Sequence, residues 1–157
     1  MQAVTGFTIP PCSVRYASLD DLAALTRLFD AYRQFYKQSS DLDGARAYLG
    51  ERLALRESVL LLAEQNAQPV GFVQLFPLFS SVGMQRVWLL NDLFVCETAR
   101  GNGVARALMA KSRAHAVATG AVSLRLSTAH TNAAAQALYE SLDYQRDTAF
   151  QGYALKL

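Results

Sequence analysis

One stretch of the chain, residues 86–108, constrains the fold more than any other part of the sequence. An apolar segment at 86–95 leads into a turn that contains Gly101 and Gly103, and an amphipathic segment begins at Val104. This order predicts a strand, a glycine-containing turn and a helix. The first N–H groups of a helix have no intrahelical acceptor, and its N-terminus carries a partial positive charge. The turn is therefore predicted to bind a phosphate or pyrophosphate.

Composition narrows the class of protein. The 157 residues suit one domain, and a net charge of +2 gives no reason to expect a nucleic acid or an anionic membrane as partner. Residues 1–12 have no hydrophobic period, so we expect a loose tail there and a single domain over 13–157. We also expect a soluble, cytoplasmic protein, because no signal-peptide pattern and no apolar run of ~18 residues is found. No metal is expected, since Cys12 and Cys96 lack metal-ligand spacing.

Hydrophobic periodicity predicts a mixed α/β domain. Strands are expected at 13–17, 59–63, 70–76, 86–95, 122–127, 144–150 and 153–157, the last two as a C-terminal hairpin. Helices are expected after a capping Ser18, at 43–56, from Val104 to Gly120, and from Thr131 or Asn132 onward. The residues expected to be buried in the second and third helices are Ala47, Tyr48, Leu53, Leu55, Val104, Ala107, Leu108, Ala114, Val117 and Ala118. His115 is expected on an exposed face.

The glycine turn also carries a family signature. Residues 100–105 match the pattern Q/R-x-x-G-x-G/A, with Arg100, Gly103 and Ala105 in the defining places. The preceding strand, Asn132 and Tyr139 stand where the GCN5-related N-acetyltransferases (GNAT) have a strand, an asparagine and a tyrosine. The sequence thus resembles that family over 13–157. The run from Tyr32 to Tyr36, followed by Asp41 and Asp43, resembles the branch of the family that acetylates histones and polyamines. The resemblance implies a GNAT fold, a mostly antiparallel central sheet flanked by about four helices.

The resemblance implies acetyl-coenzyme A as co-substrate. Its pyrophosphate would lie on the N–H groups of the turn, and its pantetheine arm along the end of the preceding strand. The residues implied in cofactor binding are Phe94, Val95, Arg100, Gly101, Asn102, Gly103, Val104, Ala105 and Asn132. Glycine tolerates positive φ and lets backbone approach a phosphate closely, which supports the same site independently. The alternatives are an ordinary strand-to-helix turn and, for Asn132, a simple helix N-cap.

A dinucleotide-binding turn is a further alternative for Gly101 and Gly103. It is rejected because Arg106 occupies the place of the third glycine in G-x-G-x-x-G. No G-x-x-x-x-G-K-[ST] sequence is present either, which excludes a P-loop.

The catalytic candidates are Asn91, Asp92 and Tyr139. An alkyl amine has a pKa of about 10.4, so a group must take a proton before the amine attacks a thioester. Asn91 and Asp92 interrupt an apolar strand, and Asn91 stands where related sequences often have glutamate. Asp92 could act as base through a water, Asn91 could position that water, or Asp92 could pin a β-bulge. Tyr139 matches the tyrosine that protonates the leaving thiolate, or it is a core aromatic.

The sequence contains fewer signals for the amine that would accept the acetyl group. Tyr32 and Tyr36, near Phe35 in the first helix, are candidates for binding a cationic amine. Their spacing also suits a core, and we expect at least two of these three rings to be buried. The hypothesis is direct transfer of acetyl to a primary amine, with a non-catalytic acyl-coenzyme A sensor or an interaction module as rivals. A homodimer through the C-terminal strands is a further expectation from the resemblance.

Overall fold

A computed structural model describes residues 11–157 of the chain. Those residues form two compact units, one that ends at Leu126 and one that spans 127–157. Most of the predicted tail, residues 1–10, lies outside the described residues, whereas Cys12 already belongs to the first strand. No helix in the described part of the chain is long and apolar enough to cross a bilayer.

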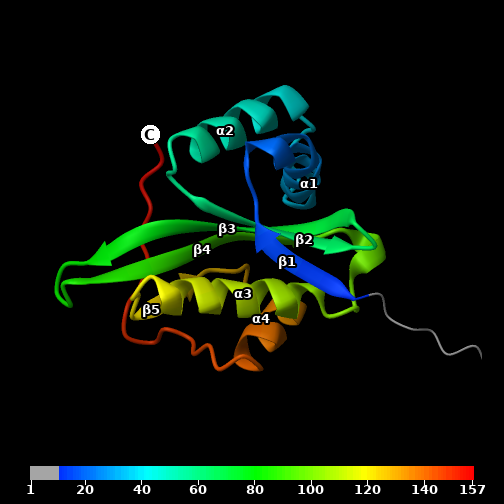
Figure 1. Ribbon diagram of the computed structural model, residues 1–157. Helices are drawn as coiled ribbons and strands as arrows, with labels where there is room; N and C mark the ends of the chain where they lie inside the picture. The colour runs from blue at the N-terminus through cyan, green and yellow to red at the C-terminus, as the bar shows by residue number, and fades with distance from the viewer. Residues whose placement is uncertain (1–10) are drawn as a thin grey trace, which may run out of the picture. The chain divides into compact units, whose positions relative to one another are not determined.

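The larger unit is built on a five-stranded sheet in the order β1-β2-β3-β4-β5. The pairs from β1 to β4 are antiparallel, and β4 pairs with β5 in parallel. Helices α1 and α2 cover one face, and α3 covers the other (Figure 1). The mixed α/β sheet with four α-helices in the described chain confirms the predicted fold class. The bounds are β1 Cys12–Tyr16, α1 Leu22–Phe35, α2 Leu42–Ala54, β2 Val59–Gln65, β3 Gln68–Ser80, β4 Gln85–Val95, α3 Val104–Ala118 and β5 Ser123–Leu126.

Local signals explain where the helices begin. Ser18 forms the predicted capping box with Asp21, at the 3₁₀ turn Leu19–Asp21 that leads into α1. Asp41 caps α2 by accepting the Gly44 N–H at 2.8 Å. Between the two helices, the buried Asp30 carboxylate accepts bonds from the Ser40 hydroxyl and the Asp41 N–H, both at 2.7 Å. These bonds lower the pKa of Asp30 and fix the corner between α1 and α2.

The helix α4, Ala133–Glu140, lies in the smaller unit and begins after Asn132, whose Oδ1 accepts the Ala135 N–H at 3.2 Å. The predicted C-terminal hairpin is wrong, because residues 141–157 contain no strand. The polar run at 145–148 breaks the period of two that a strand needs. The Asp147 carboxylate instead accepts the N–H groups of Ala149 and Phe150, which makes a local turn.

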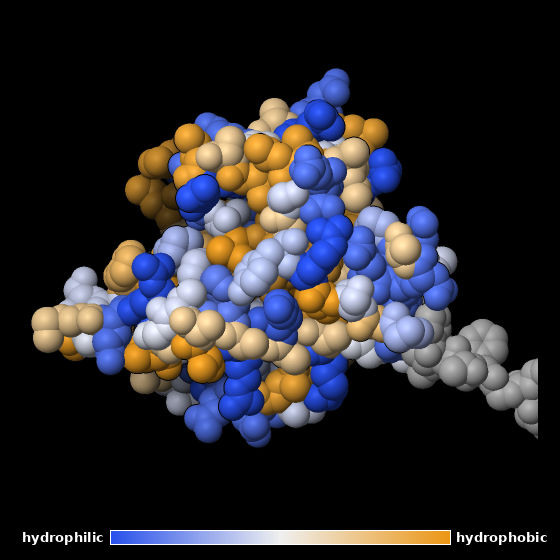
Figure 2. Space-filling view, in the orientation of Figure 1, coloured by the Kyte–Doolittle hydropathy of each residue, from blue (hydrophilic) through white to orange (hydrophobic). Residues whose placement is uncertain are grey.

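The buried faces of α2 and α3 differ from those predicted. In α2 the buried residues are Ala45 and Leu49, whereas Ala47 and Tyr48 are exposed, as is Leu55 beyond it. Apolar side chains therefore lie on the outer surface over α2 (Figure 2). In α3, Ala114, Val117 and Ala118 are exposed, and the buried residues are Val104, Leu108, Met109, Ser112, His115 and Ala116. Val104 and Leu108 of the predicted stripe are thus confirmed, and its last three residues are wrong. The prediction counted apolar residues only, whereas the buried face continues through Ser112 and His115.

His115 is buried in the larger unit, contrary to the prediction that it is exposed. Its Nδ1 lies 2.9 Å from the Tyr16 hydroxyl, and its ring centroid lies 4.6 Å from that of Trp88. Burial lowers the pKa of His115, and the nearby Arg86 and Lys111 cations lower it further. The folded protein therefore holds this imidazole neutral at a pH where a free histidine would begin to protonate.

This arrangement predicts that the protein loses stability as the pH falls from 7 towards 5. The unfolded chain binds a proton at His115 near pH 6.5, whereas the folded chain resists protonation there, so acid favours unfolding. In His115→Asn an amide replaces the imidazole and can accept from Tyr16. Its melting temperature should fall less steeply than that of the wild type over this range, as measured by thermal unfolding at fixed ionic strength. Parallel curves for the two proteins would contradict the prediction.

Candidate functional site

The site begins with a β-bulge in β4. Gln74 of β3 pairs with Asp92, and the next residue, Leu75, pairs with Leu90. Asn91 is therefore an extra residue in β4, which has no partner of its own in β3. The Asn91 Nδ2 donates to Asp92 Oδ1 at 3.1 Å, so two consecutive side chains of the strand lie close together. A regular strand would direct them to opposite faces.

Beyond the bulge, one edge of β4 is open within the larger unit. β5 pairs with β4 only at 87–90 and ends at Leu126, opposite Leu90. The Cys96 N–H donates to the carbonyl oxygen of Val70, a residue of β3, at 2.8 Å. Because antiparallel pairing alternates along a strand, Phe94 pairs with β3, and the N–H of Val95 faces the open edge. Within the larger unit the Val95 N–H therefore has no strand partner and could pair with an extended ligand.

The predicted glycine turn follows directly. Gly101 and Gly103 have φ of 77° and 78°, and a Cβ added at either position would meet no atom within 4 Å. Among residues 11–157, no acceptor is found for the N–H groups of the five consecutive residues 101–105. The turn and the first residues of α3 thus present a row of unpaired donors beside open space. Four basic side chains and one acidic side chain in 96–120 add a local net charge of +3.

Arg100 stands outside this row of donors. Its own N–H donates to the Glu97 carbonyl oxygen at 3.2 Å, so the row begins at Gly101. Its Nε donates to the Val95 carbonyl oxygen at 3.0 Å, and its guanidinium lies over the rings of Phe35 and Phe94, 5.8 and 5.9 Å from their centroids. Arg100 therefore ties the end of β4 to the end of α1.

Asp92 is buried and held from two sides. Gln74 Nε2 donates to Asp92 Oδ2 at 2.8 Å, while Asn91 holds the other oxygen. The Ser58 hydroxyl in turn donates to Gln74 Oε1 at 2.8 Å. Neither Ser58 nor Gln74 is among the site residues predicted from the sequence. The signal for Gln74 was present, because it is the one polar residue in the apolar run 70–76, as Asn91 and Asp92 are in theirs.

The aromatic side chains of α1 divide differently from the prediction. Tyr32 packs against Phe72 and Phe94 of the sheet, with ring centroids 5.9 and 6.2 Å away. Phe35 and Tyr36 are 54% and 45% exposed and contact each other edge to face. The expectation that at least two of these three rings are buried is wrong, because Phe35 and Tyr36 stand at the C-terminal end of α1 and both are exposed. An exposed aromatic pair thus lies beside Arg100.

The smaller unit carries the remaining predicted residues. Asn132 is the N-cap of α4, and Tyr139 lies in its last turn, partly buried, with its ring centroid 6.0 Å from that of Tyr144. The N-cap role that the sequence left open for Asn132 is therefore observed.

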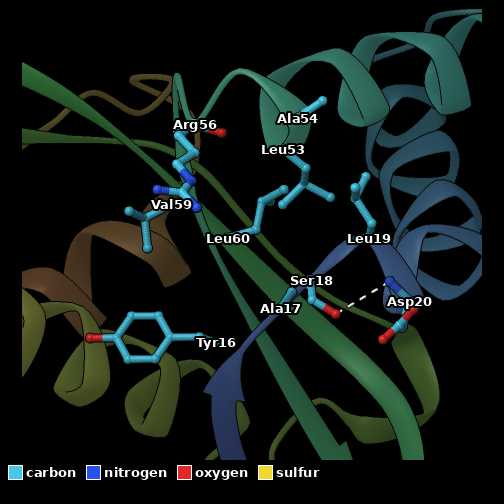
Figure 3. Close-up of a pocket in the computed structure, with 11 residues that line it drawn as sticks. Tyr16, Ala17, Ser18, Leu19, Asp20, Leu53, Ala54, Arg56, Val59 and Leu60 are labelled. Atoms are coloured by element: carbon cyan, nitrogen blue, oxygen red, sulfur yellow. Dashed lines mark hydrogen bonds between the residues drawn. The ribbon is translucent and has the colours of Figure 1, made fainter.

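A pocket of about 510 Å³ lies elsewhere in the larger unit, between the end of β1, the end of α2 and the start of β2. It is lined mainly by apolar residues, with Asp20 and Arg56 as charged groups (Figure 3). Ser18, at its wall, accepts the Asp20 N–H at 3.2 Å (Figure 3). None of the predicted site residues lines this pocket, although Ser58 does. Within the described residues, no cluster of three or more His, Cys, Asp or Glu side chains could hold a metal.

These features fit an extended ligand with a polyanionic end. The five N–H groups can bind a pyrophosphate, the missing Cβ atoms leave room for it, and the open edge of β4 can pair with an amide-containing arm. Coenzyme A has both parts. The residues present therefore fit the cofactor that the GNAT resemblance implies.

Comparison with known proteins agrees with this geometry. Residues 23–144 match the Acetyltransferase (GNAT) family. The chain is 46% identical to the uncharacterized N-acetyltransferase YhfO of Bacillus subtilis over 145 residues, 92% of this chain and 97% of YhfO. Among solved structures, a probable acetyltransferase superposes with a TM-score of 0.88 at 39% identity, over 92% of this chain and 97% of that one.

An aminoglycoside acetyltransferase, meta-AAC0020 from an uncultured soil metagenomic sample, was solved in complex with sisomicin. It matches with a TM-score of 0.75 at 17% identity, over 92% of this chain and 97% of that one, which is a likeness of fold alone. The chain belongs to the GNAT family of acetyltransferases. Neither the family nor the fold specifies the acceptor.

The row of donors predicts that Gly103→Asp weakens acetyl-coenzyme A binding by at least about a hundredfold. Two like charges 4 Å apart repel by about 4 kcal/mol at an effective dielectric constant of 20, and the new side chain would occupy the open space. Isothermal titration calorimetry measures the effect.

Gly120→Asp is the matched control. Gly120 has φ of 69°, also faces open space, and lies beyond the opposite end of α3. It should suffer similar backbone strain and keep its affinity. Equal affinity in the two variants would overturn the assignment of the anion site.

Proposed function

We propose that this protein transfers an acetyl group from acetyl-coenzyme A directly to a primary amine, in a ternary complex. The observation that carries the proposal is the row of unpaired N–H groups at 101–105, next to the open edge of β4 and the carboxylate at its bulge. One continuous segment, residues 92–105, thus carries a proton acceptor, a backbone edge and an anion site in that order. A pure interaction module would have no need of that combination.

The backbone performs binding and polarisation in this proposal. The N–H groups of residues 101–105 would hold the pyrophosphate of acetyl-coenzyme A, whose thioester supplies the acetyl group when bound. The Val95 N–H, at the open edge, would pair with the pantetheine arm or donate to the acetyl oxygen as negative charge develops. Phe94 supports this less directly, because its N–H faces β3 and its ring packs in the core. Asn132 is proposed to contact the cofactor as well.

Side chains would handle the protons. Asp92, through a water, would accept a proton from the arriving ammonium group, with the exposed Asn91 orienting that water. The neutral amine would then form its bond to the acetyl carbon as the carbon–sulfur bond breaks. The hydroxyl of Tyr139 would give a proton to the thiolate that leaves, and the second proton lost by the nitrogen as it becomes an amide would pass through water to the Tyr139 phenolate. This assigns Asp92 as base and Tyr139 as general acid.

The exposed aromatic pair supports a cationic acceptor. Tyr36 and Phe35 offer ring faces at the end of α1, near the open end of β4, and Tyr32 would support them from the core. Polyamines and lysine peptides, the acceptors of the branch that the sequence resembles, are therefore the first to test. Amino acids and aminoglycosides complete the panel.

Thermal unfolding with and without acetyl-coenzyme A tests binding first. At a ligand concentration of ~100 times Kd, specific binding should add about 2.7 kcal/mol to the free energy of unfolding. A thiol-release assay with each amine of the panel then tests turnover. Stabilisation with amine-dependent thiol release supports the enzyme. Stabilisation without turnover on any amine favours the non-catalytic sensor, and no stabilisation contradicts both.

The proposed acid role predicts that Tyr139→Phe lowers kcat by about a hundredfold, the lower end of what a positioned general acid contributes. The affinity for acetyl-coenzyme A should change little, because only the hydroxyl is removed. Tyr144→Phe, which alters the neighbouring ring of the same unit, is the control and should keep its rate. A wild-type rate in Tyr139→Phe would remove Tyr139 from the mechanism.

We also propose a cytoplasmic location and a homodimer. Residues 141–157 contain no strand, so the expected contact through C-terminal strands does not apply, and we assign no surface to the dimer contact. Sedimentation velocity of the full chain measures the oligomeric state.

A further inference from the structure

We infer that Ser58 and Gln74 are positioning residues that hold the Asp92 carboxylate for proton transfer, an inference that rests on the proposed function. They form a hydrogen-bonded chain from Ser58 through Gln74 to Asp92, with Asn91 at its far end. Nothing in the GNAT signature of residues 100–105 involves either residue.

The hydrogen bonds that join these side chains cross the sheet. Ser58 immediately precedes β2, Gln74 lies in β3 and Asp92 in β4, so the bonds run across three neighbouring strands. All three residues are buried, and Gln74 is fully so. They lie on the α1 and α2 side of the sheet, since Phe72 and Phe94, two residues away along their strands, belong to that core.

The donors and acceptors give the chain a direction. An ionised carboxylate only accepts hydrogen bonds, so Gln74 must turn its Nε2 towards Asp92. This places Gln74 Oε1 towards Ser58, whose hydroxyl donates to it at 2.8 Å. The reversed amide would bring a carbonyl oxygen against a carboxylate oxygen. Ser58 therefore locks the orientation of the amide, and the amide locks one oxygen of Asp92.

A contribution to folding stability alone explains the hydrogen-bonded series Ser58, Gln74 and Asp92 poorly. A buried hydroxyl and a buried amide gain little net free energy from their bonds, because they give up equivalent bonds to water. Apolar residues fill the neighbouring positions on this face, including Leu60, Leu62 and Phe72. A polar chain at this one place, ending on the carboxylate at the bulge, fits a requirement for a fixed carboxylate. The bulge itself needs no bond from Ser58.

Loss of either positioning residue should lower kcat. Ser58→Ala leaves Gln74 Oε1 buried without its donor and frees the amide to rotate, while Gln74→Met removes the donor to Asp92 with little change in shape. We expect kcat to fall by about 10- to 100-fold in each, the range that small misplacements of a reacting group produce. KM for acetyl-coenzyme A should stay within about twofold, because the anion site is untouched. Ser58→Thr keeps the hydroxyl and should recover most of the rate.

Ser112→Ala is the matched control. Ser112 is also a fully buried serine of the same unit, but its hydroxyl donates to the Leu108 carbonyl oxygen within α3. It should retain wild-type kcat, although it loses a buried hydroxyl as Ser58→Ala does. Melting temperatures of all variants, with and without acetyl-coenzyme A, establish that each is folded and binds.

The experiment measures kcat and KM on the best amine of the panel for wild type, Ser58→Ala, Ser58→Thr, Gln74→Met, Ser112→Ala, Asp92→Asn and the double variant Ser58→Ala/Gln74→Met. The inference expects the double variant to be no slower than Gln74→Met, since the two residues act as one chain. It also expects Asp92→Asn to be the slowest. If Ser58→Ala proves unfolded, Gln74→Met alone carries the test of loss.

The outcomes separate the two claims. No turnover by the wild type on any amine contradicts the proposed function, and the positioning role falls with it. Turnover by the wild type with unchanged kcat in Ser58→Ala and Gln74→Met overturns only the inference. A fall in Ser112→Ala equal to that in Ser58→Ala, or no recovery in Ser58→Thr, also overturns it, because a loss of packing would then suffice.

Discussion

The extra residue at Asn91 is the constraint on which the rest of the site depends. Side chains and backbone groups alternate along a strand, so one inserted residue exchanges faces and edges for everything after it. Before the bulge, Trp88 contacts His115 of α3, and after it Phe94 packs on the opposite side of the sheet with Phe72. The same shift brings Asp92 next to Gln74 and directs the Val95 N–H to the open edge. Without the bulge, the Asp92 side chain would lie on the other face of the sheet, and the Val95 N–H would point towards the other edge of β4.

The sequence was most informative where local backbone chemistry decides the structure. Gly101 and Gly103 adopt the positive φ that their turn predicted, Ser18 forms its capping box, and α3 begins at Val104. The mostly antiparallel sheet and four helices followed from periodicity and the family resemblance. Asn91 and Asp92 stood out because two polar residues in an apolar strand are costly unless hydrogen-bonded. Each of these signals lies within a few consecutive residues.

Features that depend on distant partners were missed. His115 is buried against Tyr16 and Trp88, which are distant in the sequence, and Ser112 is buried by the geometry of α3. Gln74 takes its place in the site from hydrogen bonds to Ser58 and Asp92, which are 16 and 18 residues away. The exposure of Phe35 and Tyr36, at the C-terminal end of α1, was missed as well. After Tyr144, in contrast, strands were predicted that do not form. The apolar residues at both ends of 144–157 suggested a hairpin, but the polar residues at 145–148 break the alternation that a strand needs.

The short path from the bulge to the glycine turn has a consequence for ligand choice. Val95 lies three residue steps beyond Asp92 along the extended strand, a rise of about 10 Å, and the 3₁₀ turn Glu97–Ala99 then leads to the row of donors. Because β4 is fixed by β3 on one side and by Arg100 at its end, that separation is rigid. In the proposed function, β4 would therefore fix the distance between the carboxylate at the bulge and the row of donors. It would favour acyl donors whose anionic group and reactive carbon are that distance apart.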